Sequence, residues 1–165
     1  MSELVSIVMG SDSDLEVMQD CAEVLKDFGI PYTMQVMSAH RTPGKVADFA
    51  ASAAKKGIKV MIAGAGAAAH LAGAVAANTT LPVIGVPLAA TLNGFDALLS
   101  TVQMPAGIPV ATVAVGKAGA RNAGLLAVQI LALSDLSLVK KLEAYKEKMA
   151  VSCEEKNKKL QDKIK

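Results

Sequence analysis

The stretch "LVSIVMGSDSD", residues 4–14, joins an apolar run to a turn and to the start of a helical pattern. The run Leu4–Met9 contains one polar residue and predicts a buried strand. Helical periodicity then extends from Asp14 to Phe28, and Ser13 with Glu16 has the spacing of a capping box at its start. A buried strand that turns directly into an amphipathic helix is the repeating unit of α/β proteins.

The same alternation recurs four more times along the chain. Further strands are expected at Tyr32–Met37, Val60–Gly64, Pro82–Val86 and Pro109–Val115, with Pro87 opening a loop. A second helix is expected from Pro43 to about Lys56, with Thr42 as its N-cap. A short helix that ends at about Ala77 should follow the third strand, and two more are expected at Phe95–Gln103 and at about Arg121 to Leu133. Continuously apolar strands are typical of a parallel sheet that is covered on both faces. The sequence therefore predicts one α/β domain, residues 1–165, with three α/β/α layers and a parallel five-stranded sheet in flavodoxin-like order.

A long amphipathic helix, at about residues 136–164, follows the last of these units. Leu138, Leu142, Tyr145 and Met149 form one apolar stripe along it. No strand follows this helix, so it has no return path to the sheet. It is expected either to lie across its own domain or to dock on a neighbouring subunit.

The composition argues against several classes of function. Aromatic residues make up 3% of the chain and Trp is absent, which disfavours a base-stacking surface for single-stranded nucleic acid. A formal net charge of +2 is too small to indicate a nucleic-acid partner. Cys21 and Cys153 lie far apart without disulfide or metal spacing, which fits a reducing cytoplasm. The apolar segment Val60–Ala77 is dominated by Ala and Gly, which favour membrane insertion weakly, so no membrane span is expected there.

Five loops follow the expected strands: "GSDSD", "SAHRTP", "GAGAAAH", "PLAATLNG" and "GKAGARN". They carry both histidines of the chain, His40 and His70, together with Arg41 and Arg121. Ligands of parallel α/β sheets bind beyond the carboxyl ends of the strands, and these ends meet at one edge. We therefore expect the polar side chains of these loops to lie on a single rim.

The loop "GSDSD" suits either an anion or a helix cap. Backbone N–H groups of Gly10, Ser11 and Ser13 at a helix start favour a phosphate. The carboxylates of Asp12 and Asp14 would repel a bare phosphate but could accept hydrogen bonds from sugar hydroxyls. The alternative is that Ser13 or Asp14 only caps the helix, because Ser and Asp are common N-caps.

The loop "GAGAAA", residues 64–69, matches the G-x-G-x-x-A fingerprint of dinucleotide-binding proteins. The next strand ends without the acidic residue that would hold the ribose, so a dinucleotide is disfavoured. Small residues here instead allow the backbone to approach a ligand or another chain. His70 follows at the start of the next helix, where a ligand contact and a packing or capping role are both open.

His40 and Arg41 stand side by side before a helix start that Thr42 and Pro43 already explain. Imidazole is the usual proton carrier near neutral pH, and a guanidinium offers a fixed fork for a carboxylate or a phosphate. The alternative for His40 is a hydrogen-bonded core histidine. The chain has no G-x-S-x-G elbow, no P-loop and no spacing of zinc ligands, so other chemistries lack support.

These blocks together resemble the PurE family, which contains "MGSDSD", "SAHRTP", "GAGAAAHLAG", "PVIGVP" and "DALLSTVQMPAGIPVATVAVGKAGARNAGLLA" in the same order. The resemblance covers about Leu4 to Leu133. It implies a three-layer α/β/α fold and a homo-octamer in which the C-terminal helix packs on a neighbouring subunit. It also implies an enzyme without metal or organic cofactor that acts on a small-molecule ribonucleotide. With the composition, this leads us to expect a cytoplasmic protein with neither nucleic acid nor membrane as partner.

The reaction implied by the resemblance moves a carboxylate from the exocyclic nitrogen to the ring carbon of aminoimidazole ribonucleotide, in purine (IMP) biosynthesis. A second branch of the family carboxylates the ribonucleotide directly with carbon dioxide; it resembles SAHK and lacks the histidine in the glycine loop. Arg41 and His70 therefore resemble the branch that rearranges the N-carboxylated nucleotide. A non-catalytic nucleotide-binding or assembly module is the alternative from another class.

The resemblance also implies roles for individual residues. His40 is the expected general acid/base. Ser11 and Asp14 are expected to bind the nucleotide near its phosphate and ribose, and Ser38 and Arg41 to hold the phosphate and neighbouring polar groups. The other expected substrate contacts, in the first turn and the glycine loop, are Gly10, Gly64, Ala65, Gly66, His70 and Leu71.

Overall fold

The computed structural model describes residues 3–164. The strands are β1 (Val5–Met9), β2 (Tyr32–Val36), β3 (Val60–Gly66), β4 (Val83–Leu88) and β5 (Ala111–Thr112). The α-helices are α1 (Leu15–Phe28), α2 (Pro43–Ala53), α3 (Leu71–Ala76), α4 (Phe95–Val102), α5 (Lys117–Ala132) and α6 (Leu136–Lys163). Short 3-10 helices occupy η1 (Asp12–Asp14), η2 (Ala54–Lys56) and η3 (Leu92–Gly94).

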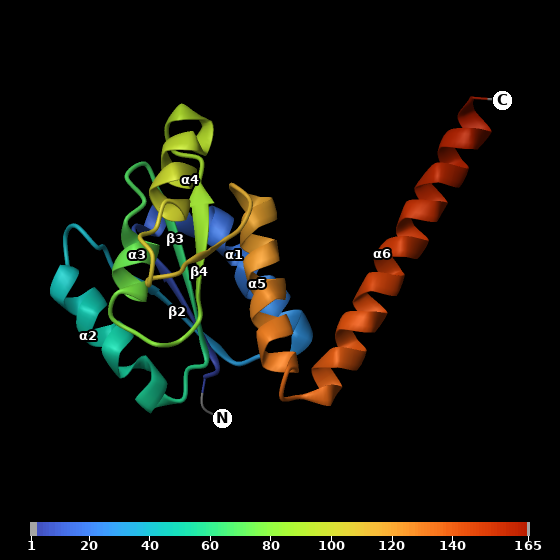
Figure 1. Cartoon of the computed structure of the whole chain (residues 1–165). Coiled ribbons are helices and arrows are strands. Elements are labelled where there is room, and N and C mark those ends of the chain that lie inside the picture. The colour runs from blue at the N-terminus through green and yellow to red at the C-terminus, as the bar shows by residue number, and fades with distance from the viewer. Residues whose placement is uncertain (1–2, 165) are drawn as a thin grey trace. The chain divides into compact units, whose positions relative to one another are not determined.

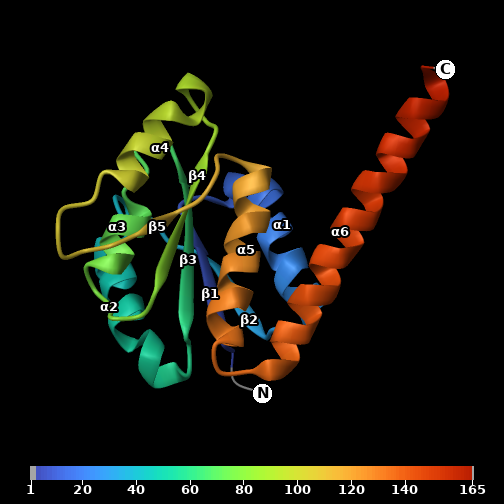
Figure 2. The ribbon, with the colours of Figure 1, turned by 45° about the vertical axis from the view of Figure 1, so that its right-hand side comes forward.

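The five strands form one parallel sheet in the order β2-β1-β3-β4-β5. In the register of β1, Val5 lies opposite Tyr32 on one side and opposite Val60 on the other. Figures 1 and 2 show α2, α3 and α4 on one face of the sheet, and α1 with the part of α5 up to Val128 on the other. This arrangement confirms the predicted three-layer, flavodoxin-like fold.

Apolar side chains fill both spaces between the sheet and its helices. Every residue of β1 is buried. Met18 of α1 is fully buried and lies against Gly64 of β3. On the other face, Val46 of α2 and Val75 of α3 belong to one apolar cluster with residues of the sheet. Burial of each such side chain stabilises the fold by about 1.5–3 kcal/mol, so the strand ends that carry the loops are rigidly supported.

The sequence led us to expect that Pro87 opens a loop, and this prediction is wrong. Pro87 lies inside β4, opposite Ala65 of β3. Its carbonyl oxygen accepts a hydrogen bond from the N–H of Gly116 at 2.9 Å. The missing N–H of Pro87 faces the same side, where β5 has already ended, so the proline removes no ladder hydrogen bond.

The β5 and α5 boundaries also differ from the expected ones. β5 covers only Ala111–Thr112 of the expected Pro109–Val115, because it is an edge strand with a single neighbour. α5 begins at Lys117 instead of near Arg121. The cause is Gly116, whose left-handed backbone (φ 75°) turns the chain so that the helix can start at the next residue.

The chain divides into two compact units, with the boundary between Val128 and Gln129. In the second unit, α6 confirms the long helix expected at about residues 136–164. Asp135 caps it, because its carboxylate accepts hydrogen bonds from the N–H and the hydroxyl of Ser137 at 2.9 and 2.7 Å. The single domain over residues 1–165 and the docking of α6 on a neighbouring subunit stay predictions.

The apolar segment at residues 60–77 folds into β3 and α3. None of the helices within residues 3–164 has both the length and the apolar character needed to span a membrane. The small residues of this segment instead serve close packing, since a Cβ on Gly85 of the adjacent β4 would lie 3.2 Å from the Cβ of Ala72.

Candidate active site

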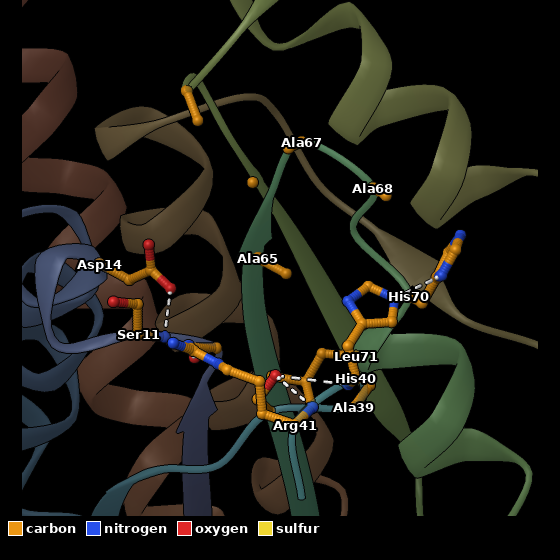
Figure 3. Close-up of a pocket in the computed structure, with 14 residues that line it drawn as sticks. Ser11, Asp14, Ala39, His40, Arg41, Ala65, Ala67, Ala68, His70 and Leu71 are labelled. Atoms are coloured by element: carbon orange, nitrogen blue, oxygen red, sulfur yellow. Dashed lines mark hydrogen bonds between the residues drawn. The ribbon is translucent and has the colours of Figure 1, made fainter. Parts of the chain in front are cut away.

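A cavity of about 390 Å³ lies at the carboxyl edge of the sheet. The loops that follow β1, β2, β3 and β4 all contribute to its wall, as the sequence led us to expect (Figure 3). Its lining residues are Gly10, Ser11, Asp14, Ser38, Ala39, His40, Arg41, Ala65, Gly66, Ala67, Ala68, His70, Leu71 and Ala90. The fifth rim loop, which follows β5 and leads to Arg121, contributes no lining residue.

The first loop is held by a capping box between Ser11 and Asp14, and the expected pair Ser13 and Glu16 does not form one. The Asp14 carboxylate accepts a hydrogen bond from the Ser11 N–H at 2.9 Å, and the Ser11 hydroxyl accepts one from the Ser13 N–H at 3.4 Å. The box lies two residues earlier because η1 adds a tight turn before α1. Glu16 instead forms an ion pair with Lys117 at 3.2 Å.

Asp14 directs its carboxylate to the cavity while its backbone starts the helix (Figure 3). Partial burial raises the pKa of this carboxyl above its ordinary value. Hydrogen bonds from the backbone of Ser11 and Gly10 and the positive charge of Arg41 oppose that rise. One carboxylate oxygen is used by Ser11, so the other remains available to a ligand hydroxyl.

The second loop, residues 38–42, is closed on itself by hydrogen bonds. The Ser38 hydroxyl accepts from the N–H groups of His40 and Arg41, at 3.3 and 3.2 Å. Thr42 occupies the N-cap position of α2 but makes no capping hydrogen bond with its side chain, contrary to expectation. Its hydroxyl instead donates to the Ser38 carbonyl at 3.1 Å and accepts from the Ser38 N–H at 3.1 Å.

Arg41 reaches from the second loop to the first. Its Nη2 donates a hydrogen bond to the carbonyl oxygen of Gly10 at 2.6 Å. The guanidinium therefore lies beside Asp14 and faces the same cavity (Figure 3). A cation with several donors in a fixed plane, set next to a hydroxyl-rich turn, suits an anionic oxygen group of a ligand.

His40 meets His70 across the cavity wall (Figure 3). The Nε2 of His40 and the Nδ1 of His70 lie 2.8 Å apart, in an edge-to-face arrangement with 4.9 Å between ring centroids. His70 is the N-cap residue of α3 but makes no capping bond with its side chain. His40 is thus an exposed, cavity-lining histidine with a partner, and the core alternative is excluded.

Ten of the eleven predicted site residues line the cavity; Gly64 alone does not. Gly64 lies behind it, where an added Cβ would strike the side chain of Met18, and its carbonyl accepts the Gly10 N–H at 3.3 Å. It therefore supports the first loop from below.

Four further residues line the cavity but were not among the predicted site residues: Ala39, Ala67, Ala68 and Ala90. Ala67 and Ala68 belong to the loop "GAGAAAH", which was expected on the rim. Ala39 lies inside the quoted "SAHRTP" block, so its place in the motif was the available signal. Ala90 lies in the loop "PLAATLNG", which was expected on the rim, but its place at the cavity depends on how that loop folds back toward Gly66. A Cβ on Gly66 would lie only 2.9 Å from the Cβ of Ala90.

The cavity combines three chemical properties in one place. Arg41 with the Ser11 and Ser38 hydroxyls can bind an anion, Asp14 can accept from sugar hydroxyls, and His40 with His70 can transfer a proton. The wall between these groups is Ala and Gly, which leaves space for a small apolar group. Within residues 3–164 there is no cluster of three or more His, Cys, Asp or Glu side chains able to hold a metal ion.

Comparison with known proteins gives a consistent result. The family described as AIR carboxylase matches residues 4–152. An N5-carboxyaminoimidazole ribonucleotide mutase of Bacillus subtilis is 56% identical over 148 residues, which are 89% of this chain and 91% of that protein. A protein of the same name from Mycobacterium leprae is 58% identical over 147 residues, 88% of this chain and 85% of the other.

A solved structure supports the same assignment. Treponema denticola PurE superimposes on this fold with a TM-score of 0.84 at 32% sequence identity, covering 96% of this chain and 98% of that one. The resemblance to PurE found in the loop motifs is thereby confirmed. With a family match that spans nearly all of the first unit and part of α6, this chain belongs to the AIR carboxylase family.

Proposed function

We propose that this protein is an N5-carboxyaminoimidazole ribonucleotide mutase, which converts the N5-carboxylated nucleotide to 4-carboxy-5-aminoimidazole ribonucleotide in purine biosynthesis. The relatives from Bacillus subtilis and Mycobacterium leprae carry that name. The observation that supports it most directly is the hydrogen-bonded His40 and His70 pair beside Arg41, in a cavity walled by small residues. In such a site His40 can supply a proton and Arg41 can bind an anion, and the small residues leave space for carbon dioxide.

The nucleotide would bind through its phosphate and ribose. Both lone pairs of the Ser38 hydroxyl accept backbone N–H groups, so this hydroxyl can only donate its hydrogen to a ligand. A donor of this kind next to the Arg41 guanidinium suits phosphate oxygens. The Ser11 hydroxyl, which donates to Oδ1 of Asp12 at 3.0 Å, would turn its hydrogen to the phosphate when the nucleotide binds. The second oxygen of Asp14 would accept from a ribose hydroxyl.

The chemical steps would use His40 as acid and then as base. Protonated His40 gives its proton to the exocyclic nitrogen as the nitrogen–carbon bond of the carbamate breaks, which releases carbon dioxide. Ala65, Gly66, Ala67 and Ala68 hold the carbon dioxide next to the ring carbon, so the second step needs no encounter from solution. The ring carbon attacks it, and neutral His40 removes the ring proton. His40 regains the proton that it gave, and the carbon dioxide that was released is bound again to the ring carbon, so the cycle needs no cofactor.

The replacement His40→Asn tests this assignment. Turnover should fall by about 10²- to 10⁴-fold, the usual contribution of a positioned proton carrier, while binding of the nucleotide measured by calorimetry is retained. Unchanged turnover would remove His40 from the mechanism. Binding without any turnover in the wild-type protein would instead favour a non-catalytic nucleotide-binding module.

A direct carboxylase is the second candidate, because the matching family is described as AIR carboxylase. The two activities are separated by giving the enzyme each substrate alone. The mutase should convert the N5-carboxylated nucleotide without added bicarbonate. Turnover of aminoimidazole ribonucleotide with bicarbonate, together with an inert carbamate, would replace the mutase assignment.

We also propose a homo-oligomer, and specifically the octamer that the family resemblance implies. Phe95, Leu99 and Val102 follow one another at helical spacing on α4 and are all exposed, Phe95 by 67%. Leu92, in the preceding turn, is exposed by 74%. An apolar stripe of this size on one helix is typical of a protein interface. Light scattering coupled to gel filtration should give the mass of eight chains, and a monomer would contradict the proposal.

We also propose a cytoplasmic location, which agrees with the state of the two cysteines. Cys21 and Cys153 are both free thiols. Fractionation of cells that produce the protein should recover it with cytoplasmic markers, and recovery with a membrane or secreted fraction would contradict the location.

A further inference from the structure

The hydroxyl of Thr42 makes hydrogen bonds that are unusual for the N-cap residue of a helix. It stands immediately before α2, where a threonine hydroxyl normally accepts an N–H group from the first turn of the helix. Its hydroxyl instead turns backward, donating to the Ser38 carbonyl and accepting from the Ser38 N–H, both at 3.1 Å. The backbone N–H of Thr42 also donates to the Ser38 carbonyl, at 2.9 Å. Both backbone groups of Ser38 are therefore satisfied by Thr42.

The helix gives up a capping bond in this arrangement. Pro43 at the first helical position lowers the need for one, because proline has no N–H to satisfy. The Thr42 hydroxyl therefore stabilises the loop and not the helix, because its hydrogen bonds to Ser38 connect the two ends of the five-residue segment 38–42.

Ser38, held in this way, in turn holds the backbone of the two functional residues. Its hydroxyl accepts from the N–H of His40 at 3.3 Å and from the N–H of Arg41 at 3.2 Å. The chain of contacts runs from Thr42 through Ser38 to His40 and Arg41. Thr42 is half-buried and does not line the cavity, so it acts on the site only through Ser38.

We propose that Thr42 is a positioning residue of the active site, whose hydroxyl fixes the loop at residues 38–42 and with it the places of His40 and Arg41. This inference rests on the proposed mutase function. Loosening the loop would leave every group that touches the substrate in the chain but would widen the range of positions they occupy. A displacement of about 1 Å at a reacting group can lower a rate about 100-fold.

The test compares Thr42→Val, which keeps the shape and removes the hydroxyl, with Thr42→Ser, which keeps the hydroxyl. Thr79→Val is the matched control, because Thr79 is also half-buried and its hydroxyl accepts a loop N–H, that of Leu81, at 3.3 Å. We expect Thr42→Val to lower kcat/KM for the carboxylate shift by about 10- to 100-fold, mostly in kcat. Thr42→Ser and Thr79→Val should stay within about threefold of the wild type, on the scale of surface substitutions.

Hydrogen exchange of the ligand-free protein gives a readout that does not depend on activity. The N–H groups of Ser38, His40 and Arg41 should exchange faster in Thr42→Val but not in Thr42→Ser or Thr79→Val, while thermal midpoints stay similar. Equal turnover and equal exchange in Thr42→Val and the wild type would overturn the inference. A general loss of protection across α2 in Thr42→Val would also overturn it, because the hydroxyl would then be stabilising the helix.

Failure of the proposed function has a different signature. A wild-type protein that does not convert the N5-carboxylated nucleotide would refute the mutase assignment, and the exchange comparison would then decide the role of Thr42 by itself. An active wild type with an equally active Thr42→Val variant would refute only the role of Thr42.

Discussion

The Nε2 of His40 and the Nδ1 of His70 lie 2.8 Å apart, which is hydrogen-bond distance between two imidazoles that belong to different loops. The rings meet edge to face, with an interplanar angle of 77°. If both facing nitrogens carried hydrogens they would repel each other, so this geometry accommodates one shared hydrogen at most. The contact thus gives the His40 ring a defined orientation.

The contact predicts a role for His70 in orienting His40. Replacement His70→Leu removes the partner nitrogen and should lower kcat by about 10- to 100-fold, because the His40 ring can then rotate. His70→Asn retains a polar atom near the Nδ1 position and should keep a larger part of the activity. Steady-state kinetics that separate kcat from KM check this prediction, because a loss of orientation should appear mostly in kcat. Equal kcat values for His70→Leu and the wild type would contradict the prediction.

Asp14 predicts a pH-dependent effect on stability. Burial raises the pKa of the Asp14 carboxyl, so its contribution to stability is present at low pH and is lost as pH rises through the folded-state pKa. Asp14→Asn stays neutral and keeps an acceptor for the Ser11 N–H. The variant should therefore gain stability relative to the wild type between about pH 4, near the ordinary Asp value, and pH 7.

Urea unfolding at the two pH values measures the effect. Asp48→Asn, which removes an exposed carboxylate from α2, controls for the change in net charge. A relative stability of Asp14→Asn that is constant or decreases with pH would contradict the sign. The same variant should bind the nucleotide more weakly, because an amide accepts hydrogen bonds from ribose hydroxyls less strongly than a carboxylate.

Two glycines in the first turns of helices predict opposite responses to alanine. A Cβ on Gly119 of α5 would fall on the carbonyl oxygen of Ala114, which is backbone and cannot move aside. Gly119→Ala should therefore destabilise the protein by about 1–3 kcal/mol or more. Gly44 of α2 has nothing within 4 Å of the corresponding position, and Gly44→Ala should stabilise by about 0.5–1 kcal/mol. Denaturant titrations decide the signs, and similar values for both variants would argue against the close approach at Gly119.

Cys21 predicts an unreactive thiol. It is fully buried in α1, and burial raises the pKa of its thiol to about 12. At pH 8 only about 10⁻⁴ of the groups would be thiolate, the reactive form. In a Cys153→Ser variant, iodoacetamide should not modify the folded protein but should modify Cys21 fully in denaturant. Rapid labelling of the folded variant would show that α1 opens readily.

Much of this molecule could be predicted from local pattern. The apolar runs at Val5–Met9 and Val60–Ala63 and the helical periodicity between them follow from short-range rules. The handedness of crossovers then orders the strands, and the parallel sheet brings their carboxyl ends together. The sequence alone therefore predicts that His40, Arg41, Ser11 and Asp14 lie at one edge.

Other features depend on contacts between distant parts of the chain. The pairing of His40 with His70 joins residues 30 positions apart, and the approach of Ala90 to Gly66 joins two loops. No local periodicity encodes such contacts, because they depend on the register of strands and the path of each loop in space. Pro87 illustrates the same limit: it is tolerated in β4 only because β5 ends before reaching it.

The direction of the Thr42 hydroxyl is the finest of these details. The sequence alone determined that a helix starts at Pro43, since N-cap chemistry and the fixed φ of proline are local properties. Only the tertiary structure decided that the hydroxyl bonds to Ser38 and not to the helix. The Thr42 hydroxyl could bond either to the first turn of α2 or to Ser38, and the path of the loop decides which partner is within reach. That path depends on how β2 and α2 are packed at its two ends.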